Sequence, residues 1–176
     1  MFGAFKRWLF LKALSDIKKR KSSKAPLHQN PTQTIHILYE DTSENDHLAV
    51  QDLIRQLKLS GKKVETLAFD KEKTTLPADT LNIYNPKNIG FNYVPSGESV
   101  DHFLSKESDV LIVLAHHFHE HMRYITYACD SYFKLGMVFP KSETYLDAMI
   151  EVKPSQSYSA IIKEMLLFME KFSFSK

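Results

Sequence analysis

Apolar runs alternate with amphipathic segments along most of the chain. The run at 109–115 contains Val-Leu-Ile-Val-Leu, which is typical of a strand buried on both faces. Similar runs predict five further strands, at 34–40, 63–69, 80–84, 133–139 and 148–152.

The segments between these strands have helical periodicity. Residues spaced i, i+3, i+4, i+7 predict a helix that is capped by Ser43 or Asn45 and ended by Gly61: Val50, Leu53, Ile54 and Leu57. Further helices are expected around 100–104, 117–131 and 157–172, with a turn or short helix at 142–147. Strands that alternate with helices in this way predict a parallel sheet covered on both faces. We therefore expect a three-layer α/β sandwich of Rossmann-like or flavodoxin-like type with a mostly parallel sheet.

A basic helix precedes this α/β region. Residues 2–20 contain good helix formers, and the polar segment 22–31 contains the helix breakers Pro26 and Pro31. The expected organisation is a basic helical arm at 1–24, a linker at 25–33 and an α/β domain at 34–176.

The apolar residues of this helix do not form one clean stripe. One broad side carries Phe2, Phe5, Leu9, Ala13 and Ile17, but Trp8, Leu11 and Leu14 fall elsewhere. A helix that lies on a membrane separates its faces better, so this helix is expected to pack partly against protein.

Charge is distributed unevenly along the chain. The whole chain has a formal net charge of +2, but residues 1–24 hold eight cationic residues against the single Asp16 and so carry +7. The remainder carries −5. Such an arm is expected to meet an anionic surface, or the acidic body itself. The cationic residues are Lys6, Arg7, Lys12, Lys18, Lys19, Arg20, Lys21 and Lys24.

Composition excludes several classes. Apolar residues make up 43% of the chain and charged residues 25%, which is typical of a globular protein. The only cysteine, Cys129, lies on an apolar stripe and is expected to be buried and inert; it permits neither an internal disulfide nor a four-cysteine zinc site. No segment reaches the roughly 20 apolar residues that cross a bilayer. We expect a cytoplasmic protein, peripheral to the inner membrane if it meets a membrane.

The usual nucleotide-binding motifs are absent. The first predicted strand ends in Tyr-Glu-Asp-Thr-Ser at 39–43, with no glycine. A dinucleotide fingerprint or a P-loop needs small residues there, because backbone N–H groups must approach the phosphates. No cofactor is therefore expected.

A histidine cluster at 116–121 follows the most regular strand, where open α/β sheets place their ligands. On a helix, His117 and His121 would share a face at a zinc-ligand spacing, and Glu40 and Asp41 end a strand that could lie nearby. The alternative is an exposed first helical turn that happens to be rich in histidine.

Three other features have a structural explanation beside a functional one. Asp41 resembles a catalytic carboxylate at a strand end, but a helix cap or Asx-turn also belongs there. Ser96 and Gly97 open a helix that could seat an anion, although Ser96 as a simple cap is commoner. Phe91 and Tyr93 could stack on bases, but no basic residue separates them, so they are expected to close the core.

Several segments together resemble a family of uncharacterised proteins of Bacteroidota. They are Asn-Pro-Lys-Asn-Ile-Gly-Phe at 85–91, Asp-Val-Leu-Ile at 109–112, Ser-Tyr-Phe-Lys-Leu-Gly at 131–136 and Ala-Met-Ile-Glu-Val at 148–152. The resemblance covers about 34–170 and includes a basic N-terminal extension. It implies a Rossmann-like domain of unknown function and supplies no catalytic residues. The histidine cluster is not part of it, which speaks against a metal site.

Two functions remain open. The first is a non-enzymatic accessory protein that docks through the basic helix on an anionic assembly. An RNA-containing complex such as the ribosome is preferred to the inner membrane, because the helix lacks a clean lipid-facing side. The second is a ligand-binding protein or metal-assisted hydrolytic enzyme that uses Glu40, Asp41, His116 and His117 at the strand ends, with His117 and His121 as weak metal candidates. The sequence leaves the oligomeric state open.

Overall fold

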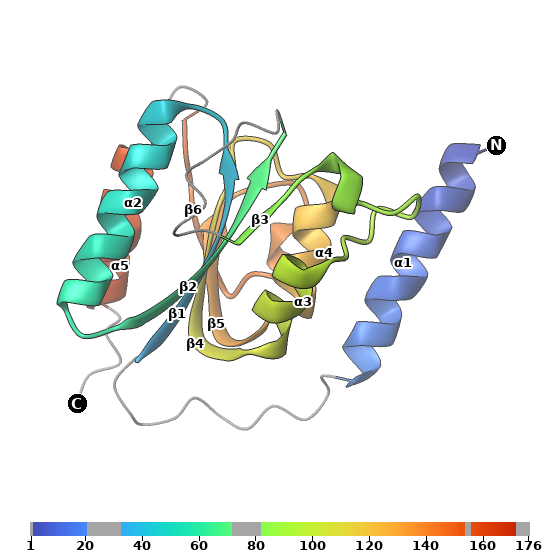
Figure 1. Cartoon of the computed structure of the whole chain (residues 1–176), viewed down its shortest axis with the longest axis horizontal. Coiled ribbons are helices and arrows are strands. Elements are labelled where there is room, and N and C mark those ends of the chain that lie inside the picture. Colours follow the sequence, from blue (N-terminus) through green and yellow to red (C-terminus); the bar gives the residue numbers. More distant parts are fainter. Residues whose placement is uncertain (1, 21–32, 72–81, 154–155, 172–176) are drawn as a thin grey trace.

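A six-stranded parallel sheet lies between two layers of helices in the computed structural model (Figure 1). The structure describes residues 2–20, 33–71, 82–153 and 156–171. Helices α2 and α5 cover one face of the sheet, α3 and α4 cover the other, and α1 lies outside α4. The helices are α1 (Phe2–Arg20), α2 (Glu44–Leu59), α3 (Glu98–Ser105), α4 (Glu120–Ala128) and α5 (Tyr158–Lys171), with short 3-10 turns at Pro86–Asn88 and Ser142–Thr144.

The strands run in the order β3-β2-β1-β4-β5-β6, and all five pairings between them are parallel. This is the order of the doubly wound Rossmann fold, in which the chain direction across the sheet reverses between β1 and β4. The expected α/β sandwich is confirmed. The strands are β1 (Thr34–Asp41), β2 (Lys63–Asp70), β3 (Asn82–Tyr84), β4 (Glu107–Leu114), β5 (Asp130–Met137) and β6 (Ala148–Ile150).

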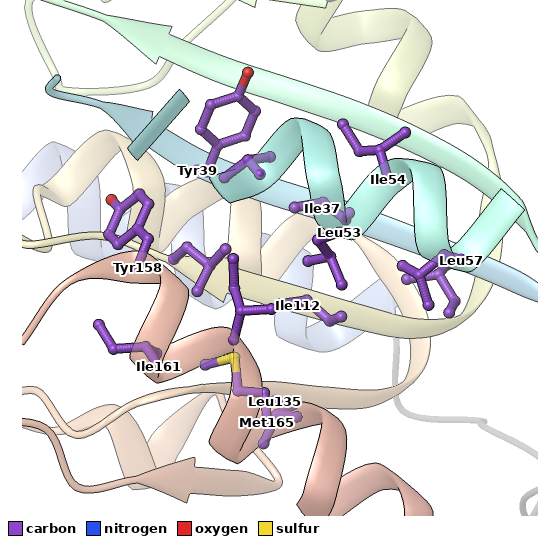
Figure 2. Close-up of a cluster of buried hydrophobic side chains, with 14 of the residues drawn as sticks. Ile37, Tyr39, Leu53, Ile54, Leu57, Ile112, Leu135, Tyr158, Ile161 and Met165 are labelled. Carbon is purple, nitrogen blue, oxygen red and sulfur yellow. The ribbon is translucent and has the colours of Figure 1, made fainter. Parts of the chain in front are cut away.

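The alternation of side chains along the central strands produces two separate cores. On β1, Ile35, Ile37 and Tyr39 face α2 and α5, where they meet Leu53 and Ile161 (Figure 2). Leu38 points to the opposite face and belongs to a second cluster, which α3 and α4 complete. Neither cluster includes any of the α1 side chains that the structure describes.

Element boundaries differ from the expected ones by a few residues. The expected strand at 80–84 is described only from Asn82, because its first two residues lie outside the described part of the chain. The helix expected at 117–131 covers only Glu120–Ala128, since the chain bends at His116 and His117 after β4 and only then enters the helix at His119, whose φ is −74° and ψ 157°. The N-cap of α3 is Gly97, at φ 118°, and no side chain makes a capping hydrogen bond there. The expectation that Ser96 caps this helix is therefore wrong.

Candidate functional site

Helix α1 is attached to the body through one side. Phe10 is 1% exposed and packs edge-on against Tyr93, with 6.4 Å between the ring centroids. The other apolar residues near this side are half-buried: Leu9, Ala13, Leu14 and Ile17. The expectation that this helix packs partly against protein is confirmed. The packed side is centred on Phe10, whereas Phe5, which was expected on the apolar side, is exposed.

The loop aromatics hold this helix instead of closing the core. Phe91 and Tyr93 are 53% and 37% exposed, and the ammonium of Lys6 lies 4.2 Å from the centroid of Phe91 and 5.7 Å from that of Tyr93. Such cation–π contacts are attractive because the ring face is electron-rich. The expected core role of these two aromatics is therefore wrong. Lys6 is turned toward the body.

The opposite side of α1 is open to solvent. Lys12 is exposed there, together with Phe5, Trp8 and Leu11, whereas Arg7 is exposed on the flank of the helix. The helix backbone continues to Arg20, so the predicted basic residues 18–20 form its last turn. The side chains of Lys18, Lys19 and Arg20, and the whole of Lys21 and Lys24, lie outside the described part of the structure.

The predicted carboxylates and histidines do meet at the carboxyl ends of β1 and β4. Glu40 has a nearly buried side chain, whose Oε2 accepts a hydrogen bond from the backbone N–H of His117 at 3.0 Å. Its other oxygen lies 3.4 Å from Nε2 of His119. Glu40 thus ties the loop after β4 to β1 at the point where Rossmann-type sheets bind ligands.

A second carboxylate–histidine pair lies beside it. Oδ2 of Asp46 accepts hydrogen bonds from the hydroxyls of Thr42 and Ser43 and lies 3.2 Å from Nε2 of His116. Burial by itself raises the pKa of Asp46, but these hydrogen bonds outweigh it and bring that pKa below its usual value. The ring of His116 stacks on Tyr158, with centroids 4.6 Å apart.

This arrangement defines the tautomer of His116. An ionised carboxylate only accepts hydrogen bonds, so Nε2 of His116 must carry the hydrogen that it donates to Asp46. Neutral His116 therefore presents Nδ1 as its basic atom. An imidazole oriented by a carboxylate can act as a general base, which is the chemical capacity of this edge of the sheet.

Asp41 does not cap a helix. Ser43 is the N-cap of α2, and Asp41 lies 3.2 Å from Nδ1 of His47 instead. Burial raises the pKa of Asp41, and the neighbouring His47 opposes that rise only in part. The expected cap is therefore wrong, because α2 begins at Glu44 and its first turn is closed by Ser43.

The proposed zinc spacing is not formed. His117 precedes α4, so it does not share a helical face with His121. The ring of His121 is buried against Phe69 and lies 2.9 Å from the hydroxyl of Tyr84, and burial lowers its pKa to about 3. Within the described residues, no group of three or more Cys, His, Asp or Glu side chains is arranged to hold a metal ion.

The sequence interpretation missed three partners in this region. Asp46, His47 and His119 complete the pairs but were not among the candidate residues. The signal for Asp46 was present, because Ser43 and an acidic residue three positions later form a capping-box pattern. The sequence places His119 in the histidine cluster but does not indicate which of these histidines would meet Glu40.

No helix in the described ranges is both long and apolar enough to span a bilayer. Neither the curated proteins nor the solved structures contain a match to this chain. The model of a family of unknown function, DUF6913, matches residues 5–172, and the chain therefore belongs to that family.

Proposed function

We propose that this protein is a non-enzymatic accessory protein that docks through α1 and the basic run after it on an anionic surface rich in phosphate groups. The observation that supports this best is the attachment of α1. Phe10 and Lys6 bind the helix to the body, while Lys12 remains exposed on its outer side and Arg7 on its flank.

Two further observations agree with the proposal. The charge of +7 in residues 1–24 exceeds what the negative end of the helix dipole needs, since cations there contribute only about 0.3–1 kcal/mol each. The family match begins at residue 5 and so includes nearly all of α1. The helix is thus part of what the family shares.

The dependence of binding on salt tests the proposal. Each phosphate that a lysine or arginine neutralises releases counterions, which gives a log–log slope of about 0.7 per contact on single strands. Replacing Lys18, Lys19 and Arg20 with Gln should therefore flatten the slope for an RNA oligonucleotide by about two units. The salt dependence of binding to vesicles that contain phosphatidylglycerol should also become weaker.

A matched variant provides the control. Lys58, Lys63 and Lys71 are exposed on the body, and their joint replacement with Gln removes the same charge from another surface. This variant should bind like the wild type. Equal slopes for the arm variant and the wild type, with either probe, would show that the basic run is only a solvated helix end.

The pair formed by Asp46 and His116 favours a second candidate function, a small-molecule site at the ends of β1 and β4. An oriented imidazole there could take a proton from a bound water or substrate. Turnover of model carboxylic and phosphoric esters, lost in His116→Gln and kept in His102→Gln, would support it. His102 is a suitable control because its side chain is 48% exposed on α3. Absence of turnover across both ester classes would reject hydrolysis.

A further inference from the structure

We infer that the surface on which α1 docks is the anionic leaflet of a lipid bilayer, with Phe5, Trp8 and Leu11 inserted among the headgroups. This inference rests on the docking function proposed above and names its partner. The sequence alone favours RNA, because apolar residues encircle the helix. The packing of Phe10 against the body accounts for the apolar residues on one side of the helix, so those on the other side can form a lipid-facing surface.

The three apolar side chains form a ridge on the outer side of α1. Their exposed fractions are 55% for Phe5, 55% for Trp8 and 50% for Leu11. Residues three apart on a helix are neighbours on its surface. The rings of Phe5 and Trp8 accordingly stack, with centroids 6.1 Å apart and planes 21° apart. The ridge is therefore continuous.

The inner side of the helix explains why this ridge is left open. Phe10 occupies the contact with Tyr93, and half-buried apolar residues extend that contact along the helix. Only one side of a helix can pack against the body, so the residues on the opposite side can be buried only by a different partner. Three large apolar residues side by side on an exposed helix are more than the scattered ones that a surface normally carries.

The charges around the ridge point to lipid. Arg7 and Lys12 border it, and the ammonium of Lys12 lies 5.6 Å from the ring centroid of Trp8. Trp, Phe and Leu beside Lys and Arg are the composition of helices that lie in the headgroup region of anionic membranes. Leu11 has no ring on which a base could stack, so RNA uses only part of the ridge.

Trp8 makes the test direct, because it is the only tryptophan in the chain. Vesicles of phosphatidylcholine with phosphatidylglycerol should shift its emission to shorter wavelength and protect it from acrylamide. Pure phosphatidylcholine vesicles should do so much less, since they lack the anionic attraction. Leu11→Ser should weaken binding to the anionic vesicles about tenfold or more, because the variant lacks the apolar side chain whose transfer from water into the bilayer favours binding.

Leu48→Ser is the matched control, since Leu48 is 55% exposed on α2, away from this helix. It should bind as the wild type does, and equal weakening by the two variants would overturn the inference. If an RNA oligonucleotide binds through the basic run while anionic vesicles leave Trp8 unchanged, the lipid inference fails and the docking function stands. If neither probe binds, both fail. Circular dichroism of each variant establishes that it is folded.

Discussion

Helices α1 and α5 carry similar numbers of large apolar residues but use them differently. In α5, Tyr158, Ile161, Ile162 and Met165 are all buried in one core cluster against the sheet. In α1, Phe10 alone is fully buried among the described side chains, and it belongs to neither core cluster. Burial against the sheet thus explains these residues of α5, whereas the exposed apolar residues of α1 need another explanation.

This difference separates residues kept for folding from residues kept for contact with something else. A buried side chain stabilises the native state by leaving water, whereas an exposed one contributes little. If the comparison is right, substitutions in α5 should lower the free energy of unfolding and substitutions on the outer side of α1 should lower binding.

The largest effect is expected for Ile161→Ala. Ile161 is fully buried in the cluster between α5 and the sheet, and such truncations cost about 2–5 kcal/mol through lost burial and the cavity left behind. Urea unfolding followed by circular dichroism measures it. Leu167→Ala, at a 47% exposed position of the same helix, should change far less. Equal costs for both would contradict the assignment of α5 to the core.

Acid should destabilise the sheet through His36. Burial, partly opposed by Glu65 and reinforced by Lys106, lowers the pKa of His36 from 6.5 to about 4. Between pH 6.5 and pH 4, His36 is therefore protonated in the unfolded chain but not in the native state. The free energy of unfolding keeps its full value above pH 6.5 and decreases as the pH falls toward 4. The expected loss is about 2–3 kcal/mol.

Denaturant unfolding at several pH values checks this, with His36→Gln as the variant. It should show a shallower loss between pH 6.5 and pH 4, measured against its own stability at neutral pH. His102→Gln, at an exposed position, should retain the wild-type slope. An unchanged slope in His36→Gln would assign the acid sensitivity to other groups.

Phe10→Ala should weaken the docking of α1 without opening the sheet. Removing this side chain forfeits the burial of a phenylalanine, worth about 1.5–3 kcal/mol. Native-state hydrogen exchange should accelerate in α1 and stay unchanged in β4. A chain that lacks residues 1–24 should still melt cooperatively. Faster exchange in β4 in either variant would mean that α1 belongs to the core.

The smallest effect on stability is expected for Leu11→Ser. This side chain is half exposed, so the free energy of unfolding should change by less than about 0.5 kcal/mol. Thermal melts would reveal a larger loss. Such a loss would show that the outer side of α1 serves folding, and it would remove the basis for a docking ridge.

The sequence predicts the sheet well because its signal is local. The run Val-Leu-Ile-Val-Leu becomes β4, and the other five strands lie where apolar runs and turn residues place them. The position of Glu40 and His116 at neighbouring strand ends also follows from the pattern, since parallel strands share a carboxyl edge.

The sequence does not predict which side of α1 faces the body. Apolar residues occur on all sides of that helix, so the choice of Phe10 depends on a partner, Tyr93, that is distant in sequence. The start of α4 is unpredictable for a similar reason. Glu40 accepts a hydrogen bond from the backbone of His117, and this contact holds the chain in a non-helical conformation where helical periodicity alone continues the helix.

The place of α1 beside α4 also has a consequence for the order of folding. The contacts of Phe10 with the body involve Tyr93 and α4, which follow the first three strands in the chain. Forming these contacts therefore closes a long loop, which costs conformational entropy. The sheet can nucleate without these contacts, because neither core cluster contains a described side chain of α1. We therefore expect a φ-value near zero at Phe10, with refolding rates unchanged by its truncation, and values well above zero for Ile112 in the central strand β4.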